Sequence, residues 1–348
     1  MRILLLSIMA KCGVFTHVRD LAASLLKKGF EPYIGFIATP AAMDMFGVSK
    51  QDRSEMEQSL SAPCFYYNSY TSLLENIEGN GADLVHAHSP IVLKHATYIK
   101  LKMDIPFVAT LHGLNSWTRN YRKELEKADR IIAVGPEIAA SCGKAFKDKI
   151  TIIFNGVDTD YFRPDYSKTL NHPLRIIWTG RTSGAAARGA EYLAFALKIL
   201  KKNNIPFEAK YMGYAFGAKV GNAENCGWVH DPLPLLQWSD MAFGRGRSLR
   251  EAMACGSAGF LLGEGYGGLV RAKWFEKGRQ PQLSGSLKHG CMKLDAQEIA
   301  RDILFFHKNR DILESARRES RLIAEKHFDV NKMTDEIVKI YTEAGADF

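Results

Sequence analysis

The sequence of 348 residues has few cysteines and no cluster of them. It contains no CxxC pair and no cysteine–histidine group at zinc-finger spacing; the six cysteines are scattered at Cys12, Cys64, Cys142, Cys226, Cys255 and Cys291. This distribution argues against a disulfide framework and against a structural zinc site, and it is typical of a reduced cytoplasmic protein.

Long apolar runs are also missing. No stretch approaches the roughly 20 apolar residues that a membrane-spanning helix needs. The apolar run at residues 3–10 is short, and Lys11 interrupts it before any small-residue cleavage pattern, so we interpret it as a buried first strand instead of a secretory signal. We therefore expect a cytoplasmic protein.

The chain has a net charge of +8 but no dense basic run. A dedicated nucleic-acid surface would need clustered lysine and arginine, so we predict no nucleic-acid partner. The positive balance is compatible with contact to phosphates or anionic lipid, and an ordinary solvated surface explains it equally well.

The length predicts two domains, because a single core seldom grows beyond roughly 250–300 residues. Both halves begin alike: a strand at residues 2–8 leads through Gly13 into an amphipathic helix, and a strand at 174–178 leads through Gly180 and Gly189 into another. We predict an α/β protein with two Rossmann-like doubly wound parallel-sheet domains facing a cleft. The turn-rich segment 155–173 places the domains at 1–165 and 166–348, with the last helix as a candidate to pack back on the first domain.

Short apolar runs between these points predict the remaining parallel strands. They lie at residues 33–38, 83–88, 106–111, 130–134 and 150–154 in the first half and at 207–212, 226–229 and 258–262 in the second. Three amphipathic helices are expected at 296–307, 311–326 and 331–343.

Ligands of open parallel sheets bind beyond the carboxyl ends of the strands, where glycine turns and helix N-termini direct N–H groups at anions. Gly13 and the Gly180 turn, with Arg181 and Arg188, are therefore candidate phosphate contacts. The alternatives are a turn glycine needed for backbone geometry and arginines on a solvated face. Neither turn forms GxGxxG, which argues against a dinucleotide cofactor.

Histidines follow two of the predicted strands. His112 ends one strand, which places it where a ligand should bind, although a structural histidine is the alternative. His86 and His88 point to one side of another strand, which suggests a metal pair, but no third ligand is expected nearby and we predict no metal site. His88 remains a candidate substrate contact.

Residues 248–251 have the pattern of a capping box that would start a helix ending at Gly256. Taken alone, this pattern gives Glu251 a structural role at the helix start. A ligand-binding role is the alternative, because a helix N-terminus is a common place for one.

In combination, these motifs resemble glycosyltransferase family 4, whose members are retaining enzymes of the GT-B type. The resemblance covers nearly the whole chain, and the LxEAMACG segment after an NGVD segment is its most specific part. The matching pieces are Cys12-Gly13 with His17-Val18, residues 84–90, residues 109–113, residues 154–158 with 162–164, Thr179-Gly180-Arg181 with Arg188-Gly189, residues 249–256 and residues 267–270.

The resemblance implies a role for each matched residue. Gly13 would offer its N–H to the donor phosphates, and Arg181 and Arg188 would neutralise the departing diphosphate. His112 would lie near the transferred sugar and Glu251 would bind the ribose. The remaining candidates are Gly180, Arg247, Gly267 and Gly268 for the donor and His17, His88 and Asn115 on the acceptor side.

The chain departs from the family pattern at several positions. An eight-residue spacing places Phe243 where the family has a glutamate that contacts the donor sugar. Arg245 and Arg247 follow it, and we hypothesise that one of them contacts the donor sugar or phosphate; flanking the loop is the alternative. Arg188 occupies the position of a lysine in the family pattern, and Cys12 occupies the position of a glycine.

The resemblance implies a retaining hexosyltransferase, independent of metal and cofactor, that moves a sugar from a nucleotide-sugar, with UDP favoured over GDP, to an acceptor hydroxyl. The acceptor would be a carbohydrate or a lipid-linked intermediate of polysaccharide or glycolipid biosynthesis, with peripheral contact to the anionic inner face of the membrane. A non-catalytic nucleotide-sugar or glycan-binding protein is the main alternative, and a phosphorylase or epimerase of the same architecture is another. A basic face for the membrane would include Lys94, Lys100, Lys102, Arg119, Arg122 and Lys123.

Overall fold

A computed structural model describes residues 1–39, 48–113, 120–167, 173–180, 187–213, 220–229, 231–278 and 281–346. The chain divides into two compact units, and each is described by itself. Unit 1 comprises Met1–Gly156 and Val330–Phe348, and unit 2 comprises Val157–Asp329. No helix among the described residues has the length and apolar character needed to cross a membrane.

Unit 1 is built on a seven-stranded parallel sheet in the order β3-β2-β1-β4-β5-β6-β7. The strands are β1 (Arg2–Ser7), β2 (Glu31–Ile37), β3 (Cys64–Tyr67), β4 (Leu84–Ala87), β5 (Phe107–Leu111), β6 (Arg130–Ala133) and β7 (Ile150–Ile152). The helices are α1 (Gly13–Lys27), α3 (Lys50–Gln58), α4 (Tyr70–Asn80), α5 (Leu93–Met103), α7 (Arg122–Lys127), α8 (Pro136–Ser141) and α14 (Val330–Glu343), with short 3-10 turns at Pro90–Val92 and Lys144–Phe146.

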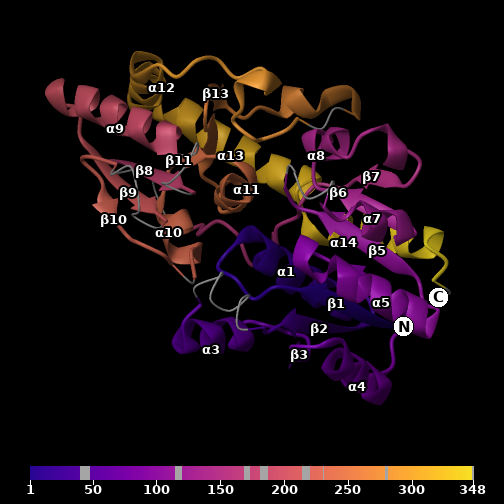
Figure 1. The fold of residues 1–348 in the computed structure, drawn as a ribbon. Helices are drawn as coiled ribbons and strands as arrows, with labels where there is room; N and C mark the ends of the chain where they lie inside the picture. The colour runs from indigo at the N-terminus through magenta and orange to yellow at the C-terminus, as the bar shows by residue number, and fades with distance from the viewer. Residues whose placement is uncertain are drawn as a thin grey trace. The chain divides into compact units, whose positions relative to one another are not determined.

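Alternation along β1 explains why this sheet carries helices on both faces (Figure 1). Ile3 and Leu5 belong to the apolar cluster that includes α1 and α14, whereas Leu4 and Leu6 belong to the cluster under α4, α5 and α7. Successive side chains of a strand point to opposite faces, so a fully buried strand must be apolar on both. The run of residues 3–6 satisfies that requirement.

Unit 2 is built on a six-stranded sheet in the order β10-β9-β8-β11-β12-β13. Its strands are β8 (Leu174–Thr179), β9 (Phe207–Met212), β10 (Glu224–Asn225), β11 (Met241–Gly244), β12 (Ala258–Leu262) and β13 (Tyr266–Leu269), of which β13 runs antiparallel to β12. Its helices are α9 (Ala187–Lys202), α10 (Leu233–Trp238), α11 (Gly246–Ala254), α12 (Ala296–Lys308) and α13 (Arg310–His327), with 3-10 turns at Ala272–Gly278 and Leu287–His289. The predicted fold class, two doubly wound α/β domains, is confirmed.

The chain passes from unit 1 to unit 2 at Gly156, before the predicted boundary at residue 165. The segment after Gly156 joins unit 2 because the N–H of Val157 donates to the carbonyl of Phe328 (2.7 Å). In addition, the Arg321 guanidinium donates to the carbonyls of Thr159 and Phe162. From Val157 onward, the predicted linker therefore belongs to the second unit.

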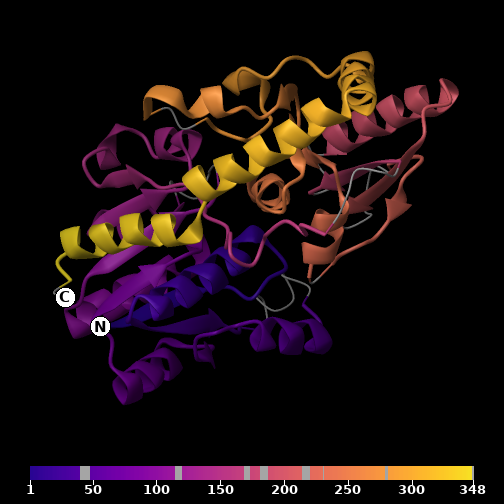
Figure 2. The same ribbon diagram turned by 180° about the vertical axis from the view of Figure 1, so that it is seen from behind.

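The last helix, α14, packs within unit 1 beside α1, as both ribbon views show (Figures 1 and 2). The Ser24 hydroxyl donates to Asn331 Oδ1 (2.9 Å), and the Lys28 ammonium pairs with Asp335 (2.5 Å). Ile337 and Tyr341 are buried in the same cluster as α1. Unit 1 therefore consists of two chain segments that are distant in sequence.

The predicted strand at residues 226–229 is wrong. The strand in this region is β10, which ends at Asn225, and Gly227 has a φ of +63°, which interrupts the extended backbone. Two further backbone hydrogen bonds follow: the N–H of Cys226 donates to the carbonyl of Tyr211 (3.0 Å), and the N–H of Gly213 donates to the carbonyl of Gly227 (2.8 Å).

Candidate functional site

Three elements of unit 1 bring polar side chains to one edge of its sheet. β4 and β5 pair in parallel, so His88 and His112, which follow their carboxyl ends, lie at the same edge. The N–H of His88 donates to the carbonyl of Leu6 in β1 (2.9 Å), which leads into α1 and His17. This edge is where ligands of open α/β sheets bind.

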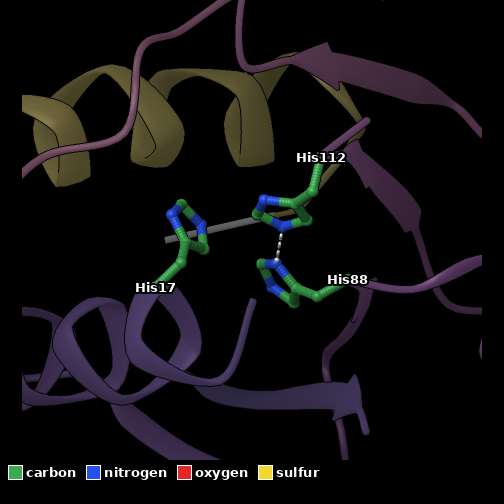
Figure 3. A group of neighbouring side chains, drawn as sticks. All are labelled: His17, His88 and His112. Atoms are coloured by element: carbon green, nitrogen blue, oxygen red, sulfur yellow. Dashed lines mark hydrogen bonds between the residues drawn. The ribbon is translucent and has the colours of Figure 1, made fainter. Parts of the chain in front are cut away.

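The rings of His17, His88 and His112 point toward one another (Figure 3). Nε2 of His112 lies 3.5 Å from Nδ1 of His88. The ring centroid of His17 lies 5.3 Å from that of His88 and 4.7 Å from that of His112. We call these three residues the histidine cluster; it places two predicted acceptor-side residues beside the predicted catalytic histidine.

We expected no third metal ligand near His86 and His88. This expectation is wrong, because His17 and His112 lie beside His88. One nitrogen from each member of the histidine cluster lies within 4.8 Å of the others. The period-two pattern of His86 and His88 could not reveal this, because His17 and His112 come from a helix and another strand.

His86 lies against the cluster but has other partners. Its Nδ1 lies 2.7 Å from the Tyr341 hydroxyl and its Nε2 lies 2.7 Å from Oγ1 of Thr110. Its ring centroid is 3.9 Å from that of His88. His86 is therefore a buried structural histidine that fixes the ring beside it, and its partner Tyr341 was not identifiable from sequence.

Burial keeps these histidines neutral. Desolvation lowers the pKa of His112 to about 3. Desolvation and, to a lesser extent, the charge of His112 lower the pKa of His86 to about 3. The pKa of His88 is well below its ordinary value, first through desolvation and then through His86, His17 and His112. At neutral pH these rings act as hydrogen-bonding groups or ligands and carry no charge.

Gly13 is the first residue of α1, as predicted for a phosphate contact. The first N–H groups of a helix have no partner within it, and they lie at the positive end of the helix dipole. A Cβ added to Gly13 would meet nothing within 4 Å. There is room at this position for a group to approach the backbone.

Unit 2 has its own glycine turn. Gly180 follows β8 with a φ of +142°, a conformation that favours glycine. Arg188 is exposed in the first turn of α9. Gly189 beside it is buried, and a Cβ there would meet the Gly263 carbonyl oxygen at 2.8 Å, so the close packing requires glycine. Arg181 and, in unit 1, Asn115 lie outside the described residues.

The predicted capping box at Ser248 is wrong. α11 begins at Gly246, with Arg245 as its N-cap, and Ser248 lies within the first turn. Its hydroxyl donates to the carbonyl of Thr179 (3.0 Å), which ties α11 to the end of β8. The helix does end as predicted, before Gly256, which has a φ of +80°.

Glu251 and Arg247 form a largely buried pair one turn apart on α11. Nε of Arg247 donates to Oε1 of Glu251 (2.8 Å). The arginine side chain is 11% exposed and the glutamate side chain 14% exposed. Without a capping role, Glu251 is held by this arginine. The pairing brings two predicted donor-binding residues together and fixes the direction of the carboxylate.

Phe243 lies within β11, in the interior of unit 2. Its side chain is fully buried and stacks on Phe260, with ring centroids 4.8 Å apart. Only Arg245 separates β11 from α11. The position eight residues before Glu251, where the family pattern has its glutamate, therefore falls inside the strand. Phe243 therefore does not occupy a ligand-contacting position.

Gly267 and Gly268 lie in the edge strand β13. Gly268 has a φ of +71° and pairs with Leu261 of β12. The neighbouring Tyr266 hydroxyl donates to Asp302 Oδ2 (2.5 Å). The structure thus places these predicted donor contacts in a paired strand.

Comparison with known proteins identifies the first part of the chain. Residues 12–161 match the family model described as Glycosyltransferase Family 4. An uncharacterised glycosyltransferase of Bacillus subtilis strain 168, YqgM, is 32% identical in an alignment of 84 residues that covers 20% of this chain and 23% of the relative. The alignment therefore spans less than a quarter of that protein.

Solved structures match both units together. A glycosyltransferase from Rickettsia africae ESF-5 has a TM-score of 0.71 at 19% identity, covering 99% of this chain and 98% of its own. Anabaena Alr3699/HepE, solved with UDP and glucose, has a TM-score of 0.70 at 16% identity, covering 98% and 99%. Residues 12–161 therefore carry a glycosyltransferase family 4-like domain, in a chain whose two units have the fold of GT-B glycosyltransferases.

Proposed function

We propose that the protein is a retaining glycosyltransferase that moves a hexose from a UDP-sugar to an acceptor hydroxyl. The observation that carries the proposal is the family match over residues 12–161, within which Gly13 and the histidine cluster lie at the carboxyl edge of one sheet. HepE, which shares the fold, was solved with UDP-glucose, which supports UDP as the nucleotide.

The reaction breaks the bond between the anomeric carbon and the diphosphate oxygen and forms one to the acceptor oxygen. The acceptor proton passes to the leaving diphosphate. The N–H groups at the start of α1 and the guanidinium groups of Arg181 and Arg188 would stabilise the charge that develops there. Because these groups supply positive charge, we propose that the step needs no divalent ion at the diphosphate.

In the proposed complex Glu251 accepts hydrogen bonds from the ribose, and its ion pair with Arg247 holds it in place. The neutral ring of His112 would contact the transferred sugar, with His17 and His88 toward the acceptor. The buried Phe243 leaves Arg245 and Arg247 as the side chains that follow β11. We keep the hypothesis that one of them contacts the donor.

The test is a comparison of UDP, GDP, ADP and their sugar conjugates, without metal, by thermal stabilisation and by release of sugar. We expect UDP to stabilise the protein and a UDP-sugar to be hydrolysed or transferred, with the anomeric configuration retained in the product by NMR. Binding without turnover would favour the non-catalytic alternative, and an isomerised or phosphorylated product would favour an epimerase or phosphorylase.

Replacement of Glu251 by alanine is expected to weaken UDP binding about 30-fold. Hydrogen bonds to a charged group contribute about 1.5–3 kcal/mol, which corresponds to about 10- to 150-fold in Kd. Isothermal titration with UDP measures the effect. Glu126→Ala is a matched control, because Glu126 accepts from Nε of Arg122 at 2.8 Å with the same spacing in an exposed helix of unit 1. Equal affinities in wild type and Glu251→Ala would remove Glu251 from the site.

Gly13→Ala is expected to leave stability within about 0.5 kcal/mol of wild type, because the added Cβ meets nothing within 4 Å. The methyl group would instead occupy the space that a phosphate needs, so we expect UDP affinity to fall about tenfold. Urea unfolding and UDP titration separate the two effects. Gly79→Ala, another helical glycine with open space around its Cβ, should leave UDP affinity unchanged and raise stability by at most about 1 kcal/mol. Unaltered UDP binding in Gly13→Ala would argue against the phosphate role.

Contact with an anionic membrane stays a prediction. In the predicted basic face, Lys100 pairs with Asp129 (2.5 Å) and Arg122 with Glu126, while Arg119 lies outside the described residues. Ion pairs reduce the net positive charge that such a face presents to lipid.

A further inference from the structure

The histidine cluster has the composition and spacing of a metal site. A zinc–nitrogen bond is about 2.0–2.1 Å, so the nitrogens of a tetrahedral site lie about 3.4 Å apart. The 3.5 Å between His88 Nδ1 and His112 Nε2 already has this spacing. All three candidate ligand atoms lie within 4.8 Å of one another, and modest side-chain rotation would bring them closer.

We propose that His17, His88 and His112 bind one divalent ion of the later first-row transition series, with Zn²⁺ as the best candidate. Three protein ligands leave the fourth tetrahedral position for water or for an oxygen of another molecule. The ion would occupy the three rings assigned above to the sugar and the acceptor, so its open fourth position would take the place of their direct contacts. Zn²⁺ binding is measured without sugar transfer, so either proposal can fail alone.

The histidine cluster contains a buried nitrogen that lacks a hydrogen bond within the described part of the chain. Nε2 of His88 is buried and has no hydrogen-bond partner among the described residues. A buried polar atom without a partner is costly, so the hydrogen bonding of the cluster is incomplete as it stands.

The neighbouring side chains decide which ion fits. His86 holds Tyr341 and Thr110 with its two nitrogens, so it supports the ring of His88 and is not a ligand. The candidate ligands are all imidazoles and include no carboxylate. Mg²⁺ and Ca²⁺ prefer oxygen ligands, whereas Zn²⁺, Co²⁺ and Ni²⁺ accept imidazole nitrogen.

The experiment uses the full chain, purified with a chelator and dialysed, and titrates it with Zn²⁺ and separately with Mg²⁺. We expect one Zn²⁺ per chain and no binding of Mg²⁺. Co²⁺ should give the visible absorption of a tetrahedral site. Loss of a residue that only supports a ligand costs about 10- to 100-fold in affinity. His17→Ala, His88→Ala and His112→Ala should therefore each weaken Zn²⁺ binding at least about 100-fold.

His289→Ala is the control, because His289 is an exposed histidine of unit 2. Its affinity for Zn²⁺ should equal that of wild type. Melting temperatures in chelator show whether each variant folds. The side chain of His112 is only partly buried, so His112→Ala is the deciding variant if His17→Ala and His88→Ala fail to fold. Absence of one-to-one binding, an unchanged affinity in folded His112→Ala, or an equal loss in His289→Ala would overturn the proposal.

Discussion

Lowering the pH from 7 to 5 is expected to cost unit 1 about 2 kcal/mol of unfolding free energy for each of His86 and His112, or about 4 kcal/mol together, and His88 adds a loss in the same direction. Desolvation holds the pKa of each ring below the 6.5 of the unfolded chain, to about 3 for His86 and His112. The unfolded state therefore takes up protons first as the pH falls through 6.5, and folding becomes less favourable. Domains have a total stability of about 5–15 kcal/mol, so this loss is large.

Hydrogen exchange of peptides from β4 and β5, measured at pH 7, 6 and 5 and corrected for the intrinsic rate, reports the unfolding free energy of unit 1. His86→Gln removes one titrating group, so the dependence on pH should become shallower by about one proton. His289→Asn should leave it unchanged, because that residue belongs to unit 2. A free energy that stays level between pH 7 and 5 would mean that the rings are protonated in the folded protein.

Gly244→Ala is expected to destabilise unit 2 by about 3 kcal/mol or to prevent its folding. Gly244 lies opposite Thr179 where β11 pairs with β8. A Cβ there would overlap the carbonyl oxygen of Thr179 and lie 2.5 Å from its Oγ1. The same carbonyl accepts from the Ser248 hydroxyl, so separating the strands would also disturb the start of α11.

Urea unfolding followed by tryptophan fluorescence measures this effect, because Trp178, Trp228, Trp238 and Trp274 all belong to unit 2. Gly221→Ala is the matched control in the same unit, since a Cβ at Gly221 meets nothing within 4 Å. A loss below about 1 kcal/mol in Gly244→Ala would show that β8 and β11 can separate at this edge without much cost.

The fold was predictable where the sequence has a clear period. The three C-terminal amphipathic helices correspond closely to α12, α13 and α14, and most of the apolar runs form strands. The missed strands β3, β11 and β13 are short, and β13 contains two consecutive glycines. Such segments form strands because the sheet beside them supplies hydrogen-bond partners, and that information is not local.

The candidate site was predictable only in part. His88 and His112 follow strands, so their shared edge could be inferred from parallel topology. The convergence of His17 with them depends on how α1 packs, and the partner of His86 lies 255 residues away. The capping box failed because Gly246, with a φ of +59°, starts α11 earlier than Ser248. Local spacing could not distinguish these starts.

The division of the chain has a consequence for its synthesis. Unit 2 is continuous and can fold when residue 329 has left the ribosome, whereas unit 1 lacks α14 until residues 330–343 have followed. Until then α14 does not cover its contact surface on α1. Nδ1 of His86 also lacks its hydrogen bond with the Tyr341 hydroxyl. The unit that is made first is therefore completed last, and a circular permutant beginning at Val330 would reverse that order.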